Sequence, residues 1–239
     1  MRKIDIWRDP FDSGYHLCEK ENIEFKEGFT VLVGCNGSGK TTMLHNIKEK
    51  VKKEDIPVLE YNNLHDGGSK SISEAFFDGD YEFGAMAMTS SEGENINLNI
   101  GKLFSRVKNF LETGKTGDKF EGLAKILIHE EEEKEVPKER WILLDAVDSG
   151  YSIDNIVMFK EVINLILEDS KKMGIKTYII ASANEYELAN GEDCLDVISG
   201  NYIKFSDYNE YRNFILETSI KKEERFEEEL DERDESEER

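Results

Sequence analysis

The chain has 239 residues, of which 38% are hydrophobic, and it carries a formal net charge of -21 at pH 7. This length suits one large domain or two small ones, and we expect one. So acidic a chain is not drawn as a whole to nucleic acid or to an anionic membrane. No apolar run is long enough to span a bilayer, and no apolar signal core follows the first basic residues, so we expect a cytoplasmic protein.

Strand and helix patterns alternate along the first part of the chain. Strands are expected at 3–7, 22–26 and 29–34, a helix at 40–52, and a further short strand at 58–61. Helical patterns then cover 72–77, 93–111 and 120–133, with a polar loop between the last two. The region therefore predicts a sheet with a helical insertion.

The second part continues the alternation. The near-continuous apolar run 141–146 predicts a strand buried on both faces, followed by a helix at 152–172 and a buried strand at 176–182. Residues 194–205 predict a hairpin that turns at Ser199, Gly200 and Asn201, and Ser206 or Asp207 is expected to cap a last helix. Together these elements predict an α/β fold: a mainly parallel sheet flanked by helices on both faces.

The last residues differ in composition. From Lys221 onward the chain has eleven acidic and five basic residues, with Phe226 and Leu230 as its large apolar groups. Such a segment buries little apolar surface, so we expect a helical extension or a disordered tail. We accordingly divide the chain into a domain at 1–219, with a helical part at about 71–135, and an acidic tail at 220–239.

One glycine-rich loop carries the clearest chemistry. Residues Gly34 to Thr41, GCNGSGKT, match the phosphate-loop pattern GxxxxGK[ST] between an expected strand and an expected helix. Glycines let backbone N–H groups converge on phosphate oxygens, and the helix N-terminus adds its positive dipole end. Lys40 is expected to reach the outer phosphates, and the Thr41 hydroxyl to ligate Mg²⁺. The expected nucleotide-binding residues in this loop are Gly34, Asn36, Gly37, Ser38, Gly39, Lys40, Thr41 and Thr42.

A second, acidic motif begins at the end of the apolar run at 141–146. Asp145 ends this strand, where a carboxylate is expected to hold the magnesium ion of a phosphate-loop site. The next residue, Ala146, has no proton-accepting group. Asp148 is the nearest carboxylate that could take the role of a general base.

Three segments together resemble ABC-type ATPases of the SMC and RecF branch: GCNGSGKTT, LLDAVDSGYSID and MTSSEGENI. The last resembles the ABC signature, with Ser91, Gly93 and Glu94 at matching positions. The resemblance implies an ABC-like P-loop fold with a small helical subdomain. It also implies ATP and Mg²⁺ as ligands, and a homodimer in which Ser91 and Gly93 of one chain face the nucleotide of the other. An ordinary helix N-cap remains the alternative for Ser91.

The chain also departs from that branch. It has no heptad arm, so it resembles an isolated head domain or a short phage-encoded ATPase. Ala146 stands where the catalytic glutamate is expected, and Asn184 where the family has its switch histidine. Asn62 or Asn63 is the candidate for the glutamine-loop residue. We therefore expect ATP hydrolysis to be slow, with Lys40, Asp145, Asp148 and Asn184 as the candidate catalytic residues.

Two functions remain open from the sequence. The first is an ATP-driven switch in DNA recombination, repair or maintenance, which contacts DNA through a DNA-processing protein or through a local basic surface. The candidate cations of that surface are Lys102, Arg106, Lys108, Lys115, Lys119 and Lys125. The second is a small-molecule kinase that phosphorylates a nucleoside or nucleotide, although no arginine-rich lid segment is visible.

Overall fold

The computed structural model describes residues 1–5, 18–63, 73, 79–116 and 137–237. Its centre is a six-stranded sheet in the order β4-β5-β6-β3-β7-β8. The strands are β3 (Gly28–Val33), β4 (Val58–Asn62), β5 (Glu139–Asp145), β6 (Lys176–Ser182), β7 (Asp193–Asp196) and β8 (Tyr202–Ile203). All neighbours are parallel except β7 and β8, which pair antiparallel. This confirms the predicted mainly parallel α/β fold.

One face of the sheet is covered by helix α1 (Lys40–Lys52) and by a small hairpin of β1 (Arg2–Asp5) and β2 (Asn22–Phe25). The bounds of α1 are those expected from the sequence. Its apolar residues Met43, Leu44, Ile47 and Val51 follow helical spacing and are buried against Leu32, Leu143 and Ile180 of the sheet. This packing holds α1 on the sheet, and a short loop joins the end of β3 to its first residue.

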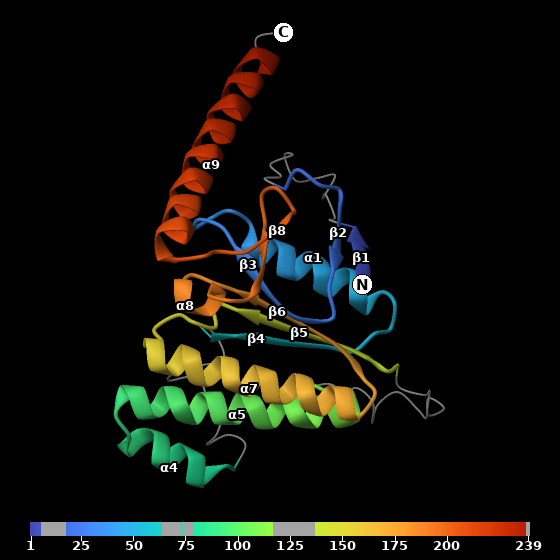
Figure 1. Cartoon of the computed structure of the whole chain (residues 1–239), viewed down its shortest axis with the longest axis vertical. Helices are drawn as coiled ribbons and strands as arrows, with labels where there is room; N and C mark the ends of the chain where they lie inside the picture. The colour runs from blue at the N-terminus through green and yellow to red at the C-terminus, as the bar shows by residue number, and fades with distance from the viewer. Residues whose placement is uncertain (6–17, 64–72, 74–78, 117–136, 238–239) are drawn as a thin grey trace.

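The opposite face is covered by α5 (Glu92–Thr113) and α7 (Ile153–Lys172), which lie side by side beneath the sheet in Figure 1. A shorter helix, α4 (Tyr81–Thr89), precedes α5 and lies outside it. Alternate strand residues supply this second core: Ile142 and Leu144 face α5 and α7, whereas Trp141 and Leu143 face α1. A strand buried on both faces explains the near-continuous apolar run in the sequence.

The chain ends with the expected hairpin and helix. Gly200 N donates to Asp196 O in the turn between β7 and β8, and Glu210 N donates to the Asp207 carboxylate at the start of α9 (Tyr208–Glu237). A short helix, α8 (Tyr186–Ala189), lies between β6 and β7. Helix α9 leaves the body of the molecule at its upper end in Figure 1. It runs without a break across residue 220, where we placed the boundary of the acidic tail.

The helices of the region between β4 and β5 differ in part from those expected from the sequence. The helices expected at 72–77 and 120–133 lie outside the described residues, apart from Ser73, which is helical. Helix α4 was not expected as a separate element. Within the described ranges, no helix combines the length and the apolarity that a bilayer crossing requires.

Candidate functional site

The loop between β3 and α1 is shaped by its glycines. Gly39 directly precedes α1 with a φ of 95°, in the left-handed region that favours glycine. At Gly34, where φ is 154°, a Cβ would lie 2.5 Å from the Ser38 hydroxyl oxygen. Real Cβ atoms keep a larger distance, so a side chain at this position would require its neighbours to shift. These two residues fold the loop back over the N-terminus of α1.

Lys40 lies inside this loop. Its side chain is buried, with only 9% of the residue exposed, and its Nζ donates to Gly34 O at 2.7 Å and to Cys35 O at 3.2 Å. Burial lowers the pKa of the ammonium, while the charges of Asp148 and Asp145 oppose that shift. An ammonium has three donors, so the two loop carbonyls leave one for an anion above the loop.

Three neighbouring strands bring polar side chains to Asp145. Asn62 ends β4, Asp145 ends β5 and Ser182 ends β6, and these strands are adjacent and parallel. Asp145 Oδ2 accepts from Thr41 Oγ1 at 2.9 Å and from Asn62 Nδ2 at 3.2 Å. Its Oδ1 accepts from Ser182 Oγ at 2.7 Å. The carboxylate is thus held by neutral donors at the carboxyl edge of the sheet.

A pocket of about 290 Å³ opens over this edge. Its wall is formed by Asn36, Gly37, Gly39, Lys40, Thr41, Thr42, Asp145, Ala146, Ser182 and Asn184. Gly34 and Ser38 are not part of this wall. Ser38 is 2% exposed, and its hydroxyl has no hydrogen-bond partner among the described residues.

The residues present fit a nucleotide with Mg²⁺. A buried ammonium and the N-terminus of α1 suit the phosphates. The hydroxyl of Thr41 and the carboxylate of Asp145 meet at one point and are the oxygen ligands that Mg²⁺ prefers. Thr41 and Asp145 would therefore hold the metal, and Lys40 would neutralise phosphate charge beside it.

Ala146 lies on the pocket wall in an unusual conformation. Its φ is 49°, in the left-handed region, and its backbone N donates to Ser182 Oγ at 2.8 Å. A residue with a Cβ costs free energy in this conformation. The position is therefore fixed by its surroundings, and its methyl group offers no base to the pocket.

Asp148 is buried beside Asn184 and is not part of the pocket wall. It is 2% exposed, and its Oδ2 accepts from Asn184 N at 2.7 Å and from Glu185 N at 2.8 Å. Burial raises the pKa of this carboxyl, while the backbone hydrogen bonds oppose the shift. Asp148 does not line the pocket wall. In this geometry it orders the segment at Asn184, and Asn184 itself does line the pocket.

Ser91 begins α5. Its hydroxyl accepts from Glu94 N at 3.4 Å, and the Glu94 carboxylate accepts from Ser91 N at 2.7 Å, which together form a capping box. The backbone N–H of Ser91 and its hydroxyl both donate to the Glu94 carboxylate, and these two hydrogen bonds lower the pKa of Glu94. Neither Ser91 nor Gly93 lines the pocket, because α5 covers the opposite face of the sheet from α1. The chain thus does not bring Ser91 to its own Lys40.

The sequence did not single out Ser182, Thr218 or Lys222. The Ser182 hydroxyl donates to the Asp145 carboxylate and accepts from Ala146 N. Its position at the carboxyl end of a buried strand is the sequence feature that could have identified it. Thr218 and Lys222 belong to α9 and contact the loop backbone at Cys35 and Asn36. No local pattern identifies them, because both lie more than 180 residues from the loop.

Comparison with known proteins adds one family. A family model described as an AAA domain matches residues 23–148, a little over half of the chain. The match begins in β2, includes the loop and α1, and ends just after Asp145. A search among curated proteins finds no relative that matches.

Proposed function

The chain belongs to the AAA domain family, a group of nucleotide-binding P-loop ATPases, and from this we propose that it is a Mg-ATP-dependent switch that dimerises around nucleotide. The observation that carries the proposal is the meeting of Thr41 and Asp145 beside Lys40 at the pocket. Bound Mg²⁺ would neutralise charge on the outer phosphates. Lys40 binds and orients those phosphates, and Thr41 and Asp145 fix the metal position.

We further propose a two-fold homodimer of the SMC and RecF-like type. Ser91 and Gly93 are absent from the pocket wall of their own chain, and they lie at the exposed N-terminus of a long helix. In an isologous pair, each of these helix ends would face the nucleotide of the other chain, so two sites are completed at once. The Glu94 carboxylate now caps that helix end, and a phosphate there would have to displace it.

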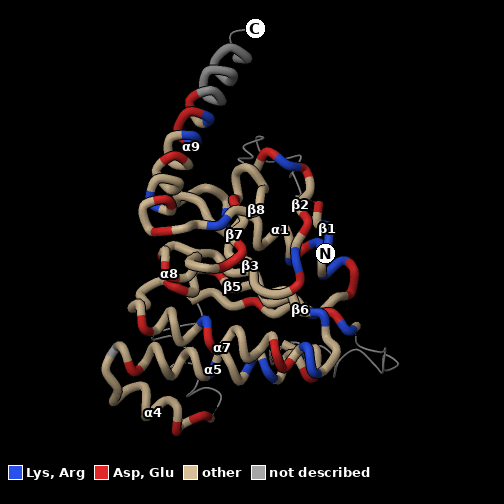
Figure 2. The backbone as a smooth tube through the Cα atoms, in the orientation of Figure 1, with Lys and Arg blue, Asp and Glu red and all other residues tan. Residues whose placement is uncertain are grey.

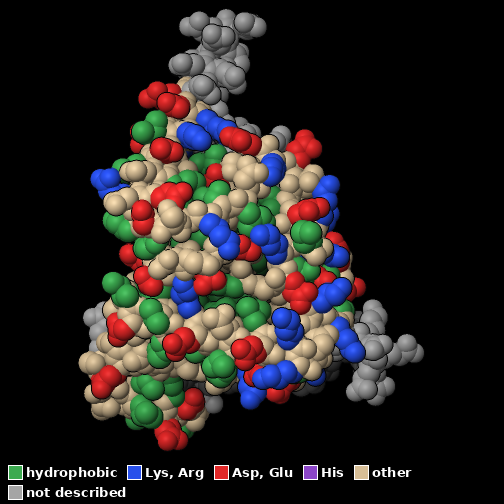
Figure 3. Space-filling view, viewed as in Figure 1, with side chains coloured by type: hydrophobic (Ala, Val, Ile, Leu, Met, Phe, Trp, Pro, Cys, Tyr) green, Lys and Arg blue, Asp and Glu red, His purple; other side chains and the backbone are tan. Residues whose placement is uncertain are grey.

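We propose that this dimer acts in DNA recombination, repair or maintenance, with a DNA-processing protein making the contact to DNA. The described cations of α5 do not form one stripe: Lys102 and Arg106 share a side of the helix, whereas Lys108 projects from another. Lys102 already lies over the Phe83 ring, with 4.5 Å between its Nζ and the ring centroid. In Figure 3, basic and acidic side chains are interspersed over the face in view. A partner is therefore favoured over direct DNA binding by this face.

The proposal also implies slow hydrolysis. Lys40, Thr41 and Asp145 can hold Mg-ATP, but Ala146 cannot accept a proton from water, and Asp148 is turned into the protein. A positioned general base contributes about 10²- to 10⁴-fold to such a rate. The ATP-bound dimer is accordingly expected to be long-lived.

The test is the molar mass in solution with and without Mg-ATP, measured by light scattering after size exclusion. The parent should change from monomer to dimer, and Ser91→Arg should remain monomeric while still binding nucleotide. Ser105→Arg, at an exposed position in the middle of the same helix, is the matched control and should dimerise. A Ser91→Arg variant that dimerises fully with Mg-ATP would contradict the assignment of the signature. A parent that stays monomeric and consumes ATP only with a nucleoside or nucleotide acceptor would favour the kinase alternative.

A further inference from the structure

One face of helix α9 is turned toward the body of the protein. The residues on this face recur at the spacing i, i+4, i+7, i+11 and i+14: Tyr211, Ile215, Thr218, Lys222 and Arg225. Tyr211 is 5% and Thr218 3% exposed, although neighbouring positions such as Leu216 and Ile220 are open to solvent. The beginning of α9 is therefore docked on the domain, and its later residues, acidic and basic in Figure 2, project beyond it.

Two residues of this face hold the backbone of the phosphate loop. Thr218 Oγ1 accepts from Cys35 N at 3.2 Å and donates to Ile215 O at 2.9 Å, so the buried hydroxyl bridges the loop and the helix. One turn later, Lys222 Nζ donates to Asn36 O at 3.1 Å. It also lies 3.8 Å from the position that a Cβ on Gly37 would occupy. Helix α9 thus fixes the loop at consecutive residues before Lys40.

The same face also holds the other wall of the pocket. Tyr211 OH donates to Asn184 O at 3.2 Å, while Asn184 N is held by Asp148. Asn36 and Gly37 lie on one side of the pocket and Asn184 lies on its wall after β6. One helix therefore contacts two pocket-lining segments that are about 150 residues apart in sequence.

At its far end the docked part is anchored once more. Arg225 Nη2 donates to Glu19 Oε1 at 3.0 Å, before β2. The contacts from Tyr211 to Arg225 therefore span four turns of α9. The Arg225–Glu19 pair lies outside the pocket wall, so this end of the docked part is held independently of the residues that line the pocket.

We propose that α9 is a positioning element for the nucleotide site, and that Thr218 and Lys222 pre-order the phosphate loop through Cys35 and Asn36. A glycine-rich loop loses conformational entropy when its amides converge on phosphate, and a loop that is already held loses less. The inference rests on the proposed nucleotide binding. Because coupling between two sites is reciprocal, bound nucleotide should in turn hold α9 in its docked position.

The first experiment measures the affinity for Mg-ATP by calorimetry. Thr218→Val keeps the side-chain shape and removes the hydroxyl, and Lys222→Met removes the ammonium. Each should weaken binding by roughly three- to tenfold, the range expected for one lost hydrogen bond. Thr218→Ser and Lys222→Arg should restore the affinity. Lys221→Met, at the exposed neighbouring position, is the matched control and should bind as the parent does.

A purely structural role is separated by two further measurements. It would lower the melting temperature of the nucleotide-free protein without changing the dissociation constant well below that temperature. Reciprocal coupling also predicts that Mg-ATP slows amide hydrogen exchange in 211–225 of the parent, and less so in Lys222→Met. Affinities within about twofold of the parent in both variants, or unchanged exchange in 211–225, would overturn the inference while the parent still binds Mg-ATP. A parent that binds no nucleotide overturns the proposed function and this inference with it.

Discussion

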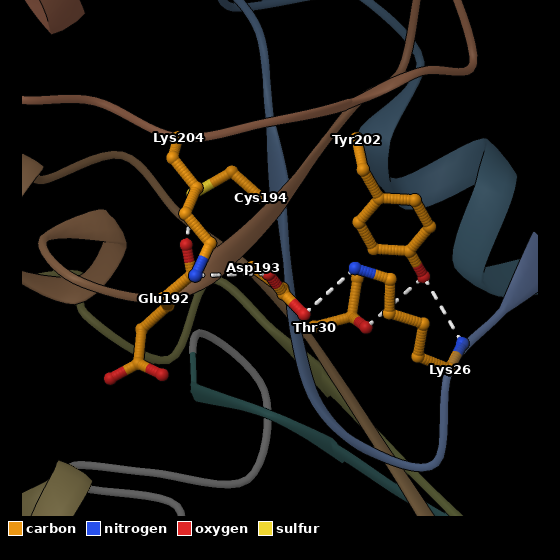
Figure 4. Close-up of polar contacts among 7 residues, drawn as sticks. All are labelled: Lys26, Thr30, Glu192, Asp193, Cys194, Tyr202 and Lys204. Carbon is orange, nitrogen blue, oxygen red and sulfur yellow. Dashed lines mark hydrogen bonds and ion pairs between the residues drawn. The ribbon is translucent and has the colours of Figure 1, made fainter.

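The two ends of the central sheet each carry a cluster of lysine, threonine and aspartate. The charged groups of the two clusters have different hydrogen-bond and ion-pair partners. At the amino end, Asp193 pairs with Lys26 at 3.0 Å through Oδ2 and with Lys204 at 3.3 Å through Oδ1. Tyr202 OH accepts from Lys26 N at 3.2 Å and lies 3.4 Å from Thr30 Oγ1 (Figure 4). We call these five residues the edge cluster.

At the carboxyl end, which we call the pocket cluster, the members are Lys40, Thr41, Asn62, Asp145 and Ser182. Here the ammonium donates to neutral carbonyls, and the carboxylate accepts from neutral hydroxyl and amide groups. Among the described residues, no ion pair joins Lys40 to Asp145. In the edge cluster the Asp193 carboxylate is paired with two ammonium groups, which join the segment before β3 and the residue after β8 to the start of β7. In the pocket cluster they remain available for an anion and a cation from outside.

The largest effect should come from Lys40→Ala. Loss of the ammonium removes a charged hydrogen bond to phosphate, so the affinity for Mg-ATP should fall by about 100-fold, while the fold remains because the side chain adds little to either core. Calorimetry measures the affinity, and circular dichroism checks the fold. Lys26→Ala in the edge cluster is the matched control and should bind ATP with parental affinity. Parental affinity in Lys40→Ala would remove the distinction between the two clusters.

The sequence predicts the sheet well because its strands have strong local signals. The runs at β5 and β6 are apolar on both faces, and glycines with the phosphate-loop spacing mark the start of α1. The meeting of Lys40, Thr41 and Asp145 also followed from the sequence, since carboxyl ends of parallel strands share one edge. These parts of the structure depend on short-range sequence patterns, from which strands, helices and the phosphate loop can be predicted directly.

The parts that the sequence did not predict depend on long-range contacts. Helix α4 has its own cap, with Asp80 accepting from Phe83 N at 3.2 Å, but its mixed Met and Ala composition lacks a clear polar face. Thr218 and Lys222 gain their role only when α9 folds back on the loop. Lys222 falls in the segment that we expected to be an acidic tail, and Thr218 lies just before it. Composition does not reveal which face of a helix is docked.

A second prediction concerns catalysis at the pocket cluster. Ala146 already has a Cβ at a φ of 49°, so Ala146→Glu adds only atoms beyond Cβ, next to Asp145 on the pocket wall. A carboxylate there can accept a proton from water, and phosphate release should rise at least about tenfold over the parent. Steady-state phosphate release measures the rate.

Asp148→Asn is the control for that experiment. It keeps the side-chain shape, and the amide oxygen can still accept from the backbone at Asn184 or Glu185. We expect little change in the parental rate, because Asp148 does not face the pocket. If Ala146→Glu shows no rise, and robust parental activity disappears in Asp148→Asn, then the catalytic role moves to Asp148.

The smallest effect should come from Asp193→Asn in the edge cluster. The hydrogen bond from Lys26, with further help from Lys204, lowers the pKa of Asp193, so its folded value lies below its unfolded value. A carboxyl of this kind stabilises the fold above its unfolded pKa, and the contribution is lost as pH falls through its folded pKa. The variant should therefore lose about 0.5–1 kcal/mol of unfolding free energy at neutral pH, a small value because the pair is partly exposed. Urea titrations from about pH 6 down to about pH 3 should show this difference shrinking.

Asp169→Asn, which breaks the exposed pair with Lys172 on α7, is the control and should lower the free energy of unfolding by less. ATP affinity should stay at the parental value, and a clear loss of it in Asp193→Asn would mean that the edge cluster supports the nucleotide site as well as the sheet.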